Sequence, residues 1–209
     1  WISPDGGKIL LSKDGRNVTV FLLKTDDFSG GTDGAVGLPY LYLPRNARIR
    51  TVLWSPDDTI TVLAGSIRHG ETTTAVYRLD LADADDRTAF TTVDDRDVRG
   101  IALAPDATRA LVWTSDGVAV KNYDTWETQI ELAHPRLLHA VWHGNSRLVL
   151  AGRHYIERVD LDMIERAGDA RSGAGRTLVA LSGVDAFGFA PENAAVRVKT
   201  GDRTLELGD

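Results

Sequence analysis

A short pattern that recurs five times along the chain constrains its fold more than any other feature. In the clearest copy, an apolar run ends in Trp54 and is followed by Ser55-Pro56-Asp57 and a second β-rich run. Proline presets φ for a turn, and an aspartate side chain can accept a hydrogen bond from the backbone two residues on. Each copy therefore predicts a strand, a tight turn and a second strand. The copies are anchored at Pro4, Pro56, Pro105, Gly144 and Pro191, which are 52, 49, 39 and 47 residues apart.

This spacing is typical of the blades of a β-propeller, which repeat every 40 to 50 residues or so. Apolar alternation predicts a third and a fourth strand after the second strand in most copies. The second strands are expected at residues 8–12, 59–64, 109–114, 147–151 and 195–199, the third at 18–24, 74–81, 118–123, 155–161 and 204–207, and the fourth at 38–43, 89–93, 128–132 and 177–181. The predicted fold is all-β, a propeller of about five four-stranded blades, and the fifth blade lacks a predicted fourth strand.

The predicted blades divide a single propeller domain over residues 1–209. The chain begins where an inner strand ends and stops where a third strand ends. Because propellers close by combining strands from both termini in one blade, we expect an incomplete part of a larger ring of six to eight blades. A five-bladed ring closed in another way is the alternative. The expected blades cover residues 1–47, 48–96, 97–135, 136–183 and 184–209, the last of them incomplete.

Glycine-containing segments mark further turns and two irregular connections. Residues 25–37 and 162–176 are glycine-rich links between third and fourth strands, and residues 163–167 are expected to form a helical turn. Two-residue hairpins that need a positive φ are predicted at Asp14-Gly15, Asp116-Gly117 and the reversed Gly201-Asp202.

The repeat resembles the WD40-like repeat of TolB-type β-propellers. The matching features are Trp-Ser-Pro-Asp at 54–57, a β run, a glycine turn and a strand ending in Asp-Leu, as in Y-R-L-D-L at 77–81 and E-R-V-D-L at 157–161. The resemblance covers nearly the whole chain. The fourth copy departs from it with His143-Gly144-Asn145, and the fifth has Glu192 in place of aspartate.

The resemblance implies a non-enzymatic protein-interaction scaffold of the bacterial cell envelope. It implies an extracytoplasmic location, periplasmic or at the cell surface, and is compatible with a lipid anchor upstream of Trp1. The alternative is the propeller domain of a larger hydrolase, such as a prolyl-oligopeptidase-like serine peptidase, where it would gate access to a separate catalytic domain. A third hypothesis places small-molecule binding or hydrolysis in the central channel, without a convergent set of residues to carry it.

Charge and composition exclude several other classes. The formal net charge of -6 argues against a general nucleic-acid or anionic-membrane surface, since either would need a basic excess. Cysteine is absent, which removes disulfides and thiolate chemistry. No apolar run approaches the roughly 18 residues of a spanning helix. We therefore expect a protein partner, with no nucleic acid and no direct membrane span.

Candidate metal and catalytic residues are weighed against structural roles. Zinc needs three or four ligands converging on one point, whereas His139 and His143 flank a strand and would lie about 13 Å apart. Together with His134 and His154 they are interpreted as a cluster at a blade edge. Residues 80–87 lack the glycine-centred calcium loop, and residues 29–37 lack the Gly-Lys-Ser/Thr end of a phosphate loop. No Gly-x-Ser-x-Gly turn occurs, so neither a catalytic residue nor a cofactor or metal site is assigned.

Two aromatic residues and an acidic segment are the candidate interaction surface. If exposed, aromatic side chains such as these are the usual anchors of protein interfaces, although packing in the core is the default interpretation for each ring. An acidic segment can attract a basic partner, or form a solvated connection between strands. The candidates are Trp126, Tyr155, Asp83, Asp85 and Asp86.

Overall fold

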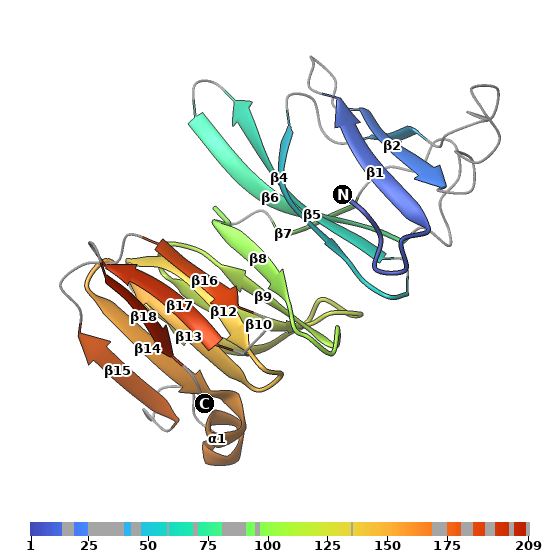
Figure 1. The fold of residues 1–209 in the computed structure, drawn as a ribbon. Coiled ribbons are helices and arrows are strands. Elements are labelled where there is room, and N and C mark those ends of the chain that lie inside the picture. The colour runs from blue at the N-terminus through green and yellow to red at the C-terminus, as the bar shows by residue number, and fades with distance from the viewer. Residues whose placement is uncertain are drawn as a thin grey trace. The chain divides into compact units, whose positions relative to one another are not determined.

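The structure is a computed structural model, and it describes most of the chain in segments (Figure 1). Among the described residues the secondary structure is β-strand apart from one short helix. The described segments are residues 1–13, 19–24, 40–42, 47–57, 59–68, 71–80, 91–94, 97–134, 136–168, 175–180, 186–190, 195–200 and 203–207.

The strands form five antiparallel sheets, each built from strands consecutive in the chain. The first sheet contains β1 (Lys8–Lys13), β2 (Thr19–Lys24) and β3 (Tyr40–Tyr42), and the second contains β4 (Arg48–Trp54), β5 (Thr59–Arg68), β6 (Glu71–Asp80) and β7 (Thr91–Asp94). The third contains β8 (Gly100–Leu103), β9 (Arg109–Trp113), β10 (Gly117–Asn122) and β11 (Thr128–Ala133). The fourth contains β12 (Leu137–His143), β13 (Arg147–Gly152), β14 (Tyr155–Asp160) and β15 (Arg176–Ala180), and the fifth contains β16 (Ala186–Ala190), β17 (Ala195–Thr200) and β18 (Arg203–Leu207).

The sheets follow the sequence repeats, which confirms the predicted fold class. The predicted second, third and fourth strands all appear within a few residues of their expected ends. The helical turn expected at residues 163–167 is α1 (Leu161–Ala167). The chain divides into two compact units, unit 1 at residues 1–98 and unit 2 at residues 99–209. The single domain expected over the whole chain stays a prediction.

The Pro-Asp turns of the first three copies form the hydrogen bonds that their sequence predicts. In three copies the aspartate Oδ1 accepts the backbone N–H two residues on, which closes the turn between the first and second strands. These bonds run from Gly7 to Asp5 at 2.9 Å, from Thr59 to Asp57 at 3.2 Å and from Thr108 to Asp106 at 3.0 Å.

The hairpin at Asp116-Gly117 forms, but for a different reason from the one predicted. Gly117 begins β10 and is not among the residues with positive φ. A Cβ at this position would lie 2.2 Å from the backbone oxygen of Leu132 on β11. Glycine is therefore needed here because two strands approach closely. The other predicted hairpins, at residues 14–15 and 201–202, lie outside the described residues.

Each unit has its own apolar core. In unit 1, buried side chains of the second sheet, such as Ile60 and Val62, pack with Leu10 of β1. In unit 2, Leu111 and Val120 of the third sheet pack against Trp142 and Leu148 of the fourth. The Trp142 indole N–H also donates to the backbone oxygen of Ala102 on β8, at 3.2 Å. The third and fourth sheets are thereby joined face to face.

Candidate functional site

The polar residues of unit 2 gather on the two sides of β14. Successive side chains of a strand point to opposite faces of its sheet. Val159 lies in the core shared with the third sheet, so Glu157 is on that same side. Arg158 and Asp160 are on the opposite side. The strand thus contributes to a buried polar cluster on one side and to an open pocket on the other.

The buried cluster, here called the Glu157 cluster, consists of His134, Tyr155, Glu157 and Arg176. Glu157 is only 4% exposed and accepts hydrogen bonds from His134 Nε2 and from Arg176 Nε and Nη2, the last at 3.0 Å. In the tautomer with its proton on Nε2, His134 accepts at Nδ1 a hydrogen bond that the Tyr155 hydroxyl donates, over 2.9 Å. The Tyr155 and His134 rings also stack, with centroids 4.7 Å apart.

These contacts shift the pKa values of Glu157 and Tyr155. Burial alone would raise the pKa of Glu157, but the hydrogen bonds from His134 and Arg176 outweigh it and lower the pKa from 4.5 to about 2. Burial and the nearby Glu157 charge raise the pKa of the Tyr155 hydroxyl. A carboxylate held ionised by two donors is a poor general base, and a protonated tyrosine is a poor nucleophile. The cluster joins the end of β11 to β14 and β15.

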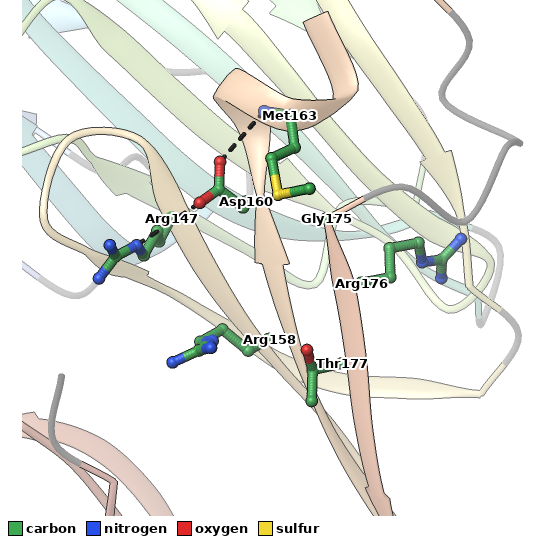
Figure 2. A pocket seen from close by; sticks show the side chains of 7 residues that line it. All are labelled: Arg147, Arg158, Asp160, Met163, Gly175, Arg176 and Thr177. Carbon is green, nitrogen blue, oxygen red and sulfur yellow. Dashed lines mark hydrogen bonds and ion pairs between the residues drawn. The ribbon is translucent and has the colours of Figure 1, made fainter. Parts of the chain in front are cut away.

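The open pocket lies against the other side of the same strands and has a volume of about 620 Å³. Figure 2 shows its lining, with Arg147 joined to Asp160, and Asp160 to the backbone of Met163. Arg176 extends away from Asp160, towards its partner Glu157. The remaining lining residues are Arg158, Gly175 and Thr177.

A third feature is the end of unit 2 at which β8, β10, β12 and β14 begin. Loops from different sheets are hydrogen-bonded to one another there. Leu137 N–H donates to Ser115 O at 3.2 Å, and His134 N–H to Asp116 O at 2.8 Å. The Arg99 guanidinium Nη1 donates to Leu137 O at 3.1 Å. The loops of the third and fourth sheets therefore form one continuous surface.

This surface, here called the basic rim, consists of Arg99, Arg136, Leu138, His139, Arg153 and His154, all of them exposed. Leu138 is 38% exposed because it occupies a β-bulge between Leu137, which pairs with Gly152, and His139, which pairs with Ala151. Among the described residues of unit 2, Asp116 is the only acidic residue in these loops. The rim thus has a positive excess in a chain whose formal net charge is -6.

The predicted interaction residues fall in different places. Trp126 is 8% exposed and packs edge-on to Tyr123 with Lys121 over its ring. Tyr155 is half-buried beside the rim, in the Glu157 cluster. The structure does not bring these two rings together, because Trp126 follows the end of β10 and Tyr155 begins β14. Asp83, Asp85 and Asp86 lie outside the described residues.

The candidate metal ligands and the possibility of a membrane span can be compared with the described part of the chain. His134 binds Glu157, and the described part of the chain holds no group of three His, Asp or Glu side chains able to hold a metal ion. Residues 29–37 and most of the acidic stretch 80–87 lie outside that part. The helix in the described segments is too short to cross a membrane.

Sequence reasoning missed Glu157 and Arg176 as a pair. The signal was present in the strand Y-I-E-R-V-D, where Glu157 shares a face with the apolar Val159. A carboxylate on the core side of a strand needs a partner. Identifying Arg176 as that partner required the pairing of β14 with β15, which places Arg176 opposite Val159.

Comparisons with known proteins agree with this architecture. No protein-family model matches the chain, and no curated protein matches it. Many solved structures are similar to it, and three of them have identities of 8 to 14%, which show the fold alone. The first is Kuenenia stuttgartiensis hydrazine synthase, with a TM-score of 0.63 and 14% identity over 100% of this chain and 70% of that chain. The second is the C-terminal WD40 domain of Sif2, with a TM-score of 0.60 and 8% identity over 98% of this chain and 55% of that chain. The third is dihydro-heme d1 dehydrogenase NirN in complex with DHE, with a TM-score of 0.63 and 13% identity over 100% of this chain and 44% of that chain.

Because its sheets repeat along the sequence and similar solved structures include a WD40 domain, the chain has a β-propeller fold of the WD40-like kind. It spans between about half and about two thirds of the lengths of the similar structures.

Proposed function

We propose that this propeller is a protein-interaction scaffold that binds an acidic segment of a partner at the basic rim. The observation that carries the proposal is the rim itself, where three arginines on the loops and an exposed leucine in β12 lie at one end of unit 2. Binding residues on loops of a rigid scaffold can engage a partner without movement of the core.

Charge complementarity identifies the chemistry of the partner. Arg99, Arg136 and Arg153 can each form a charge-assisted hydrogen bond with a carboxylate, and arginine presents two parallel donors for it. Leu138 offers an apolar contact between these charges. Asp97, two residues before Arg99, belongs to unit 1 and accepts a hydrogen bond from Thr74 at 3.2 Å. The complementary partner is therefore an acidic protein segment that also carries an apolar side chain.

The Glu157 cluster supports binding over catalysis at this end of unit 2. It lies beneath the rim, joins β11 to β14 and β15, and leaves its carboxylate saturated with donors. Its contribution to the scaffold is to hold the loop at residues 134–137 in place. The Tyr155 ring also packs on Gly152, where a Cβ would lie 2.0 Å from the ring.

The finer assignment rests on the sequence repeat. We propose a TolB-type scaffold of the bacterial cell envelope, exposed to the periplasm or the cell surface. The support is the Ser-Pro-Asp pattern and the strands ending in Asp-Leu. Fractionation of native cells, with the protein followed by antibody, tests it: recovery with the cytoplasmic fraction contradicts the envelope assignment.

A second candidate is the propeller part of a larger enzyme, including a prolyl-oligopeptidase-like hydrolase. It is favoured by the names of two similar structures, a synthase and a dehydrogenase, of which this chain spans 70% and 44%. The intact mass of the native protein tests this candidate. A further segment of some 250 residues with a Gly-x-Ser-x-Gly turn would favour the hydrolase.

Affinity capture with a charge-reversed rim tests the proposed function. The variant carries Arg99→Glu, Arg136→Glu and Arg153→Glu, and its control carries Arg166→Glu, Lys199→Glu and Arg203→Glu, three exposed cations elsewhere in unit 2. Both variants have the same net charge. We expect the wild type and the control to capture the same acidic protein, with at least a tenfold loss in the rim variant. Equal capture by all three proteins, or no specific capture by the wild type, contradicts the proposal.

A further inference from the structure

The open pocket of the fourth sheet offers a site that is separate from the rim and independent of the proposed function. Strand pairing fixes which of its groups share a face. Arg147 pairs with Asp160 across β13 and β14, and Arg158 pairs with Thr177 across β14 and β15. These four side chains therefore form two adjacent cross-strand rows on the side of the sheet opposite the Glu157 cluster.

The two arginines of this face differ in their environment. Arg147 Nε lies 3.7 Å from Asp160 Oδ2, so part of its charge is balanced within the pocket. Arg158 is exposed, and no hydrogen bond or ion pair joins its guanidinium to another residue in the described part of the chain. The Thr177 hydroxyl lies on the next strand, in the same row.

The acidic group of the pocket is directed towards the helix. Asp160 is the N-cap of α1, and its Oδ1 accepts the Met163 N–H at 3.1 Å. Gly175 allows the chain to pass close by, since a Cβ there would lie 2.6 Å from Asp160 O and 2.9 Å from Met163 Cβ. With Arg176 occupied by Glu157 on the other side, the pocket keeps a positive excess centred on Arg158.

We propose that this pocket binds the oxyanion of a small ligand, a carboxylate or a phosphate, through Arg158 and Arg147. Guanidinium groups bind both anions through two parallel N–H donors, and the Thr177 hydroxyl supplies a further donor at the same row. Met163, which is 49% exposed, gives the pocket an apolar wall beside the charged groups. A carboxylate attached to a short alkyl chain therefore fits better than a bare phosphate.

An NMR titration of the full chain tests the proposal directly. The probes are inorganic phosphate and hexanoate, each added at constant ionic strength, and the readout is the arginine Nε–Hε signals. We expect saturable shifts of the Arg158 and Arg147 signals, with hexanoate binding more tightly than phosphate. Tighter phosphate binding at the same signals would overturn the preference for an alkyl carboxylate. The absence of saturable shifts for both probes would overturn the site itself.

Two matched variants separate the pocket from general charge effects. Arg158→Gln removes the central guanidinium, and Arg203→Gln removes an exposed arginine of β18 that belongs to neither the pocket nor the basic rim. We expect Arg158→Gln to weaken hexanoate binding at least tenfold, as followed at Arg147, and Arg203→Gln to leave it unchanged. Equal weakening by both variants would show that the anion senses only net charge, and would refute the assignment.

Discussion

Substitution of Glu157 by glutamine tests the physical account of the buried cluster. The folded state lowers the pKa of this carboxyl from 4.5 to about 2. At about 1.4 kcal/mol per pKa unit, the ionised carboxylate stabilises the folded state by about 3 kcal/mol. Because the pKa is lowered on folding, this stabilisation is complete above pH 4.5 and is lost as the pH falls through about 2.

Glutamine keeps the size of the side chain but cannot become a carboxylate. We expect Glu157→Gln to be about 3 kcal/mol less stable than the wild type at pH 7, and the difference to shrink progressively between pH 4.5 and pH 2. The measurement is urea unfolding followed by tryptophan fluorescence, since Trp113, Trp126 and Trp142 lie in unit 2. Glu127→Gln, at an exposed turn position, is the control and should change stability by less than about 0.5 kcal/mol.

A stability difference that stays constant from pH 7 to pH 2 would refute this reasoning. It would mean that the carboxylate charge does not contribute to the stability of the folded state, and that the substitution acts only through packing or hydrogen-bond geometry. A variant with wild-type stability at pH 7 would refute it as well, because a buried carboxylate that accepts three hydrogen bonds cannot be neutral to replacement.

Four further substitutions test local features by urea unfolding. Gly117→Ala should lower the free energy of unfolding by about 2 kcal/mol, because its Cβ would meet the backbone oxygen of Leu132. Gly144→Ala has open space around its Cβ but a positive φ, so it should lower the free energy of unfolding by about 1 kcal/mol. The reverse order would contradict the close approach argued for Gly117. Asp160→Ala should cost about 1 kcal/mol by removing the N-cap of α1, and an unchanged midpoint would show that the cap contributes nothing. Trp142→Phe should cost about 2 kcal/mol by removing the hydrogen bond to Ala102, and wild-type stability would show that this bond is dispensable.

Much of the fold could be predicted because its signals are local. Pro56-Asp57 forms a turn through contacts within four residues, and the apolar runs beside it need only their own alternation to form strands. The positions of five sheets followed from the recurrence of this unit. The departures of the fourth copy did not change its sheet, because Gly144 adopts a positive φ of 66° and provides the turn in place of Pro-Asp.

The site could not be predicted to the same degree, because it depends on contacts between repeats. Glu157 meets His134 across 23 residues, and only the packing of two sheets brings them together. Arg136 and Leu138 owe their exposure to a positive φ and a β-bulge, neither of which has a marker in the surrounding residues.

Hydrogen–deuterium exchange of the chain with and without its captured partner tests the central claim most directly, since it locates the binding surface without prior choice of residues. The account predicts slower exchange of the backbone N–H groups at residues 99–100, 114–117, 136–139 and 152–155, which belong to the basic rim and its supporting loops. Protection confined to the opposite end of unit 2, at residues 105–108, 123–127 and 144–146, would contradict it.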